Sequence, residues 1–376
     1  MLENIPAEEA QQIRNIADLT IQQLHYRYPG ERRVLRGVHA KDHGCVNATF
    51  HVLSDIAETM RHGVFTKPGK AYSALVRFSN ASTVVAQDST PGENGGPPAH
   101  GSRGMAIKLL GAKGTPLENA HGPLTQDFLM INQPVFAFAN VEDYEVLSQV
   151  LLETLKAGKE DPGPFFVRRL PVPNSGTPPT ASQLRALNTF RLIKRIRSST
   201  SEPDTGAFQP PPASPVDNDY FGAAPFLLGP DQVMRFRVRP RSRSTEEPNV
   251  HDPNYLRTAL VKRLSRETQG EVVFDFEVQA RPAACIDPDL HIENASREWL
   301  ESEAGKFHPV ATLTIPLQEV DTPELRVRCE RLVFTPWHGL EAHRPLGGIN
   351  RMRKSVYEAS AMFRNLPKEP STQCDR

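Results

Sequence analysis

An arginine and a tyrosine stand four residues apart near the end of the chain, in the segment RMRKSVYEAS. On a helix, Arg353 and Tyr357 would share one face, about one turn apart. A free tyrosine has a pKa of about 10, but a neighbouring guanidinium favours the phenolate and a ferric ion favours it much more. The pair therefore has the composition that an iron-ligating phenolate needs. The same spacing also suits a packed tyrosine beside a surface arginine.

A histidine early in the chain could move protons. His39 follows an apolar pair and precedes a glycine-containing turn and a strand, in RVLRGVHAKDHGCVNATFHV. A histidine in such a place could be a general base with a pKa near neutrality. A hydrogen-bonded structural histidine is the alternative. His43 and His51 are equally available, so local chemistry does not single out His39.

Two further polar residues stand out against apolar neighbours. Asn132 ends a predicted strand, before Gln133 and Pro134, where a fixed amide could orient a small oxygen ligand or simply form a turn. Arg77 lies within an otherwise apolar strand, where an unpaired charge is costly. We therefore expect Arg77 to have a buried anionic partner, either a carboxylate of the protein or one of a cofactor.

Hydrophobic periodicity predicts the elements that must position these residues. Apolar residues that alternate, or that form short buried runs, indicate strands at 46–52, 73–78, 104–110, 127–131, 232–240, 271–280 and 309–317. Helical spacing and capping residues indicate helices at 7–28, 140–158, 252–270 and 348–363. Roughly eight strands in two groups, with helices at the start, middle and end, predict an α+β protein with an antiparallel sheet or barrel.

Five segments, in this order, resemble the haem-catalase superfamily, and especially its small bacterial, catalase-related peroxidase branch. They are RGVHAK, VRFS, SRGMAIKL, NQPVF and RKSVY. The longer segments HGCVNATF and HRPLGGINRMRKSVYEAS look specific to the small branch. The resemblance covers roughly residues 30–160 and 220–366.

The resemblance implies a catalase-like antiparallel β-barrel with surrounding helices and a haem buried between the barrel and the C-terminal helix. Tyr357 would be the iron ligand, as is usual for catalases. His39 and Asn132 would be the catalytic residues of the opposite, distal side, and Ser79 would hydrogen-bond His39. The propionates of the haem would be bound by Arg36, Arg77 and Arg364. Val38 and Arg353 would also contact the cofactor.

The function implied is a haem-dependent peroxide-metabolising oxidoreductase, a catalase or a peroxidase, with haem b as cofactor. Its substrate would be hydrogen peroxide or an organic hydroperoxide, with a small organic electron donor in the peroxidase case. One alternative is a fatty-acid hydroperoxide isomerase or lyase of the allene oxide synthase type. Such enzymes tend to have threonine where this chain has Val38, which favours hydrogen peroxide. A non-catalytic haem-binding protein is the other alternative, but a carrier has no use for a distal base.

Bulk composition restricts partners and compartment. Lys+Arg and Asp+Glu are equal at 44 each, so no global basic field would hold nucleic acid. No apolar stretch is long enough to span a membrane, and the N-terminus has no secretory pattern. The four cysteines are widely spaced, with no zinc or disulfide pattern, so we expect a cytoplasmic protein.

We expect residues 1–376 to form a single haem domain, because distal and proximal residues come from different halves of the chain. Within it, residues 198–219 form a Pro/Ser-rich connector and residues 367–376 a flexible tail. The long N-terminal arm and the C-terminal extension of large catalases look absent. NADPH binding is therefore not expected, and the oligomeric state stays open.

Overall fold

The structure, a computed structural model, describes residues 2–30, 35–82, 85, 87–90, 99–117, 124–159, 162–171, 177–198, 209–265 and 270–364. The expected tail at 367–376 lies outside the described residues, as does the 199–208 part of the connector. The described part of the connector contains one short 3-10 turn, Pro215–Asp217.

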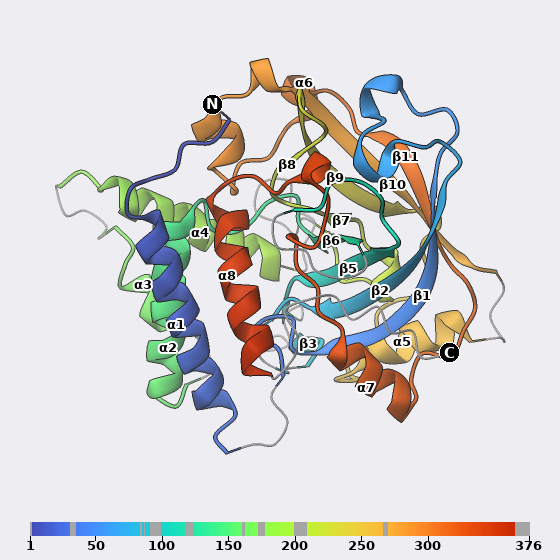
Figure 1. The fold of residues 1–376 in the computed structure, drawn as a ribbon. Coiled ribbons are helices and arrows are strands. Elements are labelled where there is room, and N and C mark those ends of the chain that lie inside the picture. Colours follow the sequence, from blue (N-terminus) through green and yellow to red (C-terminus); the bar gives the residue numbers. More distant parts are fainter. Residues whose placement is uncertain are drawn as a thin grey trace.

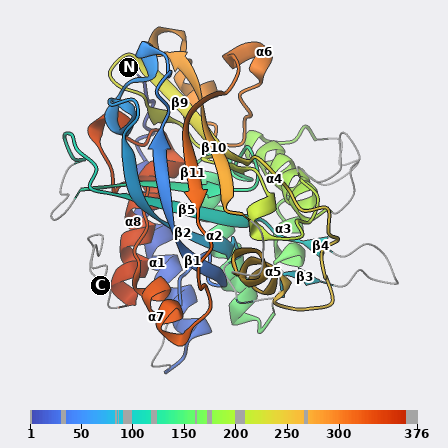
Figure 2. The same cartoon turned by 90° about the vertical axis from the view of Figure 1, so that its right-hand side faces the viewer.

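A closed antiparallel barrel forms the body of the molecule (Figure 2). Its strands follow the order β10-β11-β1-β2-β5-β6-β7-β9, and β9 pairs back onto β10. This closure confirms the predicted α+β architecture with an antiparallel barrel. The bounds are β1 Asp42–Val52, β2 Ala71–Asn80, β5 Arg103–Leu110, β6 Thr125–Ile131, β7 Tyr220–Phe221, β9 Gln232–Pro240, β10 Val272–Pro282 and β11 His308–Ile315. Outside the ring, β8 (Phe226–Leu227) adds to β9, and β3 (Ser89–Thr90) pairs with β4 (Ala99–His100).

Aromatic side chains fill the inside of the barrel. The alternation along β10 directs Phe274 and Phe276 inward, as a period of two requires. Phe128 of β6 lies 4.8 Å from Phe276 and 5.0 Å from Phe236, measured between ring centroids. Because the interior is packed in this way, a large ligand must lie outside the barrel, against its outer face.

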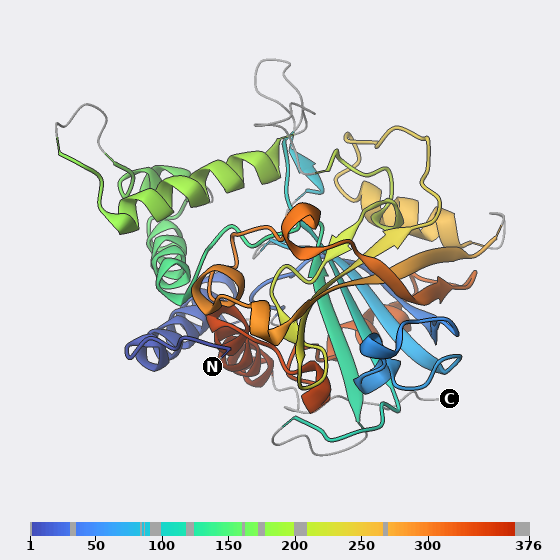
Figure 3. The ribbon, with the colours of Figure 1, turned by 90° about the horizontal axis from the view of Figure 1, so that it is seen from above.

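Three helices pack together against one side of the barrel (Figures 1 and 3). They are α1 (Glu9–Arg27), α2 (Val141–Lys156) and α8 (Gly348–Phe363), all close to the predicted ranges. The Asn140 side chain caps α2 by accepting from the Asp143 N–H at 3.0 Å, as predicted. The other helices are α3 Gly163–Val167, α4 Ala181–Arg197, α5 Tyr255–Leu264, α6 Glu301–Ala304 and α7 Pro323–Arg331.

Four of the described helices, α3, α4, α6 and α7, were not expected from the sequence, and α3 and α6 have only 5 and 4 residues. The two longer ones are α4 and α7. Each has a start signal that could have revealed it: Thr180 and Gln183 form a capping box at α4, and Thr322 precedes Pro323 at α7. Both helices have polar, weakly periodic sequences, so hydrophobic spacing gave little indication of them. None of the helices within the described ranges has the length and apolar character needed to cross a membrane.

A disulfide joins Cys45 of β1 to Cys329 of α7, with 5.5 Å between the two Cα atoms. The expectation that the cysteines stay unpaired is therefore wrong for these two. They are separated by 284 residues, and only the closure of the barrel brings β1 and α7 together. Cys285 is free and exposed, and Cys374 lies outside the described residues.

Candidate functional site

One pocket lies between the outer face of strands β2, β5 and β6 and the helices α1, α2 and α8. With its open mouth it encloses about 1100 Å³. Most of the predicted haem residues line it together, although they come from positions 36–79 and 353–364 of the chain: Arg36, Val38, His39, Arg77, Ser79, Arg353, Tyr357 and Arg364.

His39 occupies the loop just before β1, with a positive φ of 57°. Few non-glycine residues adopt this conformation, which needs support from its surroundings. Arg77 supplies part of that support by donating from Nη2 to the His39 carbonyl oxygen at 2.9 Å. The ring Nδ1 lies 3.0 Å from Ser79 Oγ, so the contact expected between these two side chains is present.

Gly104 of β5 provides the space for the His39 ring. A Cβ atom at this position would overlap the imidazole and would lie 2.9 Å from Ser79 Oγ. Burial, followed by the positive charge of Arg77, lowers the pKa of His39 to about 3. The imidazole is therefore neutral near pH 7, as a proton acceptor must be.

Arg353 and Tyr357 share one face of α8, as their spacing predicted. The Arg353 guanidinium lies 5.4 Å from the centroid of the Tyr357 ring and 5.6 Å from that of Phe136. Its Nη1 donates to Asn350 Oδ1 at 3.0 Å, while its buried Nε has no partner among the described residues. Because that hydrogen-bond acceptor is a neutral amide, the charge of Arg353 remains available to the phenol.

Asn350 is fully buried, and its amide is fixed in orientation. Its Nδ2 donates to the carbonyl oxygens of Pro225 and Leu346, both at 3.0 Å. Because the NH₂ group is occupied by two carbonyls, the Oδ1 atom must face Arg353. Sequence reasoning missed Asn350, although it lies three residues before Arg353, one turn away on the same helix.

Three guanidiniums converge at another part of the pocket. Arg36, Arg77 and Arg364 all line it, and burial lowers the pKa of each. The pKa of Arg36 is lowered further by the charges of the other two. The anion near Arg77 is Glu330, which is only partly buried and whose Oε1 lies 3.8 Å from Arg77 Nη2. Glu330 gave no signal in the sequence as a site residue.

Asn132 is not among the residues that line this pocket. It is almost fully buried at the end of β6, where its Oδ1 accepts from the Arg103 N–H at 2.7 Å and from Gln133 Nε2 at 2.8 Å. Its Nδ2 has only a long contact, 3.5 Å, with Asn218 Oδ1. The structure therefore brings together the other predicted residues and leaves Asn132 behind the wall.

Tyr144 of α2 is a second phenol in the pocket, which sequence reasoning missed. Burial, with a smaller contribution from Tyr357, raises the pKa of Tyr144 to about 12. Tyr144 therefore stays protonated near neutral pH and is a poor candidate for an anionic ligand.

The residues that line the pocket could hold a haem. A phenol beside an uncompensated guanidinium, Tyr357 with Arg353, can bind a ferric ion. The three converging arginines suit two carboxylates, and the buried Nε of Arg77 has no partner among the described residues. His39 is held where it could contact a small ligand.

Comparison with known proteins supports the same fold. No protein-family model matches the sequence, and no curated protein does. A bacterial catalase structure is similar with a TM-score of 0.55 and 15% identity, over 90% of this chain and 58% of that one. A fungal catalase structure is similar with a TM-score of 0.57 and 12% identity, over 93% of this chain and 66% of that one. The chain therefore has a catalase-like fold and spans about 60% of the length of these catalases.

Proposed function

We propose that this chain binds haem in the pocket between His39 and Tyr357 and converts a peroxide, as a catalase or a peroxidase does. The observation that carries the proposal is the convergence of His39, Arg353 and Tyr357, with three buried arginines, in one pocket of a catalase-like fold. When bound, haem b would supply the iron at which the oxygen–oxygen bond is broken.

Tyr357 would bind the iron as a phenolate, with Arg353 stabilising the anion from the same helix face. Arg36, Arg77 and Arg364 would bind the two carboxylates of the cofactor. Val38 would contact the ring beside His39. Together these residues would hold one cofactor from both halves of the chain, so we also propose that residues 1–376 act as a single haem domain.

His39 would move a proton between the two oxygens of the substrate. In the tautomer whose Nδ1–H donates to Ser79 Oγ, Nε2 is left with a free lone pair. Because the pKa of His39 is lowered to about 3, this atom is unprotonated near pH 7. It would accept the proton of the nearer oxygen and return it to the departing one.

Asn132 would orient the peroxide, although its side chain now lies behind the wall. Its Nδ2 has only the 3.5 Å contact with Asn218, which is too long for a strong hydrogen bond. This weak contact could be given up, but the Oδ1 atom is held by Arg103 N–H and Gln133. The amide would therefore have to turn away from Asn218 before Nδ2 could reach an oxygen ligand in the pocket.

Hydrogen peroxide is the proposed substrate, because Val38 stands beside His39 where fatty-acid hydroperoxide enzymes tend to have threonine. The small catalase-related branch is proposed on the segments HGCVNATF and HRPLGGINRMRKSVYEAS. A cytoplasmic location is also a proposal. The cysteines no longer argue for this location, because Cys45 and Cys329 form a disulfide.

Haem reconstitution of the purified chain tests the proposal. We expect the wild type to develop a Soret band of the phenolate-ligated type and to turn over hydrogen peroxide, because Tyr357 supplies the anionic ligand. Tyr357→Phe should lose the band or change its type. Tyr26→Phe alters an exposed tyrosine, 51% accessible, and should behave as the wild type. Turnover is measured on hydrogen peroxide, with and without a phenolic donor, and on a fatty-acid hydroperoxide.

Three outcomes would count against parts of this proposal. A wild-type protein that takes up no haem would overturn it as a whole. An unchanged spectrum in Tyr357→Phe would remove Tyr357 as the ligand. Turnover confined to the fatty-acid hydroperoxide would replace hydrogen peroxide by the isomerase or lyase alternative.

A further inference from the structure

The three pocket arginines carry more positive charge than the neighbouring carboxylates balance. Arg36, Arg77 and Arg364 are mostly buried, and the carboxylate bound to them is that of Glu330. Asp42 also acts on Arg36 and Arg77, but it forms its own ion pair with Arg257 at 2.9 Å. Among the described residues, three positive charges against one negative charge leave this cluster with two unbalanced positive charges.

Glu330 binds the cluster from behind and does not line the pocket. Its Oε2 accepts from Arg36 Nη1 at 3.0 Å, and its backbone carbonyl accepts from Arg364 Nη1 at 3.3 Å. The carbonyls of Cys329 and Leu332, at the end of α7, accept from Arg36 Nη2. Glu330 therefore does not contact a ligand in the pocket and can act on it only by its charge or through the arginines.

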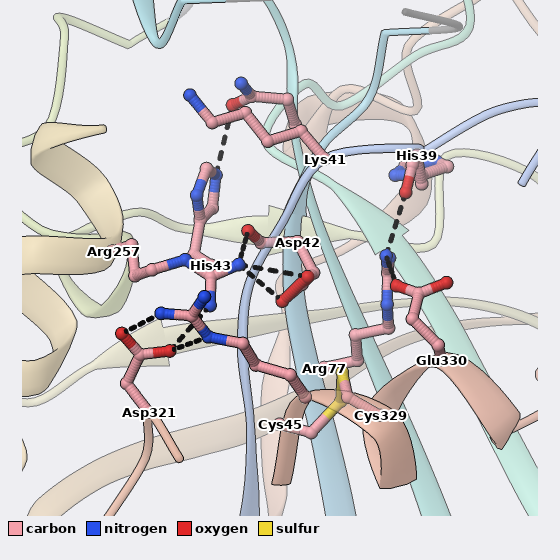
Figure 4. A network of polar contacts seen from close by, with 12 residues as sticks. His39, Lys41, Asp42, His43, Cys45, Arg77, Arg257, Asp321, Cys329 and Glu330 are labelled. Atoms are coloured by element: carbon pink, nitrogen blue, oxygen red, sulfur yellow. Dashed lines mark hydrogen bonds and ion pairs between the residues drawn. A yellow bond between two sulfur atoms is a disulfide. The ribbon is translucent and has the colours of Figure 1, made fainter. Parts of the chain in front are cut away.

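The disulfide holds Glu330 in this place (Figure 4). Cys45 of β1 is directly opposite Arg77 of β2 in the antiparallel register. Directly opposed residues of a sheet project to the same face. Because Cys329 is joined to Cys45, the residue that follows Cys329 lies beside Arg77.

We propose that Glu330 is a resident counter-ion that sets the charge of a site for a doubly negative ligand. The inference rests on the proposed function, in which haem with its two carboxylates is that ligand. Glu330 stabilises the ligand-free protein by balancing one of three buried cations. It also lowers the affinity for the ligand, because its own negative charge lies just beyond the arginines.

Glu330→Gln separates the charge from the hydrogen bond, since the amide oxygen of glutamine can still accept from Arg36. The probes are iron-free protoporphyrin IX, which has both carboxylates but cannot use Tyr357 as a metal ligand, and its dimethyl ester, which has no carboxylates. We expect Glu330→Gln to bind the diacid roughly tenfold more tightly and the ester unchanged. The ligand-free variant should unfold at a lower temperature, by a few degrees.

Glu324→Gln is the matched control, because Glu324 lies on the same helix, is exposed, and loses the same charge. It should change the affinity for neither porphyrin. If Glu330→Gln does not fold, Glu330→Asp withdraws the carboxylate from Arg36 and should show a smaller shift, again for the diacid only.

The outcomes separate this inference from the proposed function. Wild-type protein that binds no porphyrin, with or without iron, would overturn both. A wild type that binds the diacid, with a Glu330→Gln variant that weakens diacid and ester equally or changes neither, would overturn the counter-ion and leave haem binding intact. A purely structural role for Glu330 predicts that equal weakening.

Discussion

His39 combines an uncommon backbone conformation with a tightly fitted side chain. Its φ of 57° is supported by Arg77, and its ring lies between Ser79 and the bare backbone of Gly104. Such strained positions persist only where the surroundings over-determine them, and they cluster at functional sites. The glycine at position 104 is therefore required by the imidazole rather than by the strand, whose own φ there is ordinary.

Gly104→Ala should displace the His39 ring while leaving the barrel and Tyr357 in place. Its Cβ would overlap the imidazole and crowd Ser79 Oγ. We expect haem uptake to be retained and peroxide turnover per haem to fall about a hundredfold, the usual contribution of a general base. Gly101→Ala is the control, because nothing lies within 4 Å of its added Cβ. Equal turnover in the two variants would show that the imidazole is not needed in its present position.

At the scale of elements, α7 depends on a covalent link to the barrel. The helix is short, Pro323–Arg331, and mostly polar, and its buried residue is Cys329. Isolated helices of this length are marginal in water, so most of its stability must come from tertiary contacts. The Cys45–Cys329 disulfide and the Arg36 contacts at its C-terminal end supply them.

Replacing both Cys45 and Cys329 by alanine should lower the free energy of unfolding by about 5 kcal/mol, since the disulfide closes a long loop in the unfolded chain. Denaturant unfolding of the haem-free protein measures this change. A reducing agent should lower the free energy of unfolding of the wild type by a similar amount. It should do the same for Cys285→Ser, which removes the exposed free cysteine. If reduction leaves the unfolding midpoint where it was, the two cysteines are not paired in solution.

At the scale of the whole molecule, several histidines are buried in their neutral form. Burial lowers the pKa of His39 to about 3 and that of His343 to about 4, and it lowers the pKa of His43 well below its usual value. Below pH ~6.5, the ordinary pKa of histidine, the unfolded chain binds protons that the folded protein does not. Their contribution to stability is therefore complete above pH ~6.5 and is lost as the pH falls.

The free energy of unfolding of the haem-free protein should thus decrease as the pH is lowered from 6.5 toward 4. Each buried histidine contributes a slope of at most about 1.4 kcal/mol per pH unit. Denaturant unfolding at a series of pH values measures this dependence. His343→Gln should flatten the curve, whereas His308→Gln, at an exposed position, should leave the slope unchanged. A wild-type stability that is constant over this range would contradict the burial of neutral histidines.

The sequence by itself determined the regular elements and the local pairs of the site. The alternation at 232–240 and the helical spacing at 348–363 correspond to β9 and α8 residue for residue, because these periods are set by local backbone geometry. For the same reason, Arg353 and Tyr357 could be placed on one helix face. The roles proposed for the other pocket residues came only from the order of five segments that resemble catalases.

The tertiary structure alone decided what lies between distant segments. It joined Cys45 to Cys329, set Glu330 against the pocket arginines, and left Asn132 behind the pocket wall. Contacts of this kind depend on barrel closure and strand register, which bring together residues hundreds of positions apart. Local sequence patterns describe each element separately and contain no information about its distant neighbours.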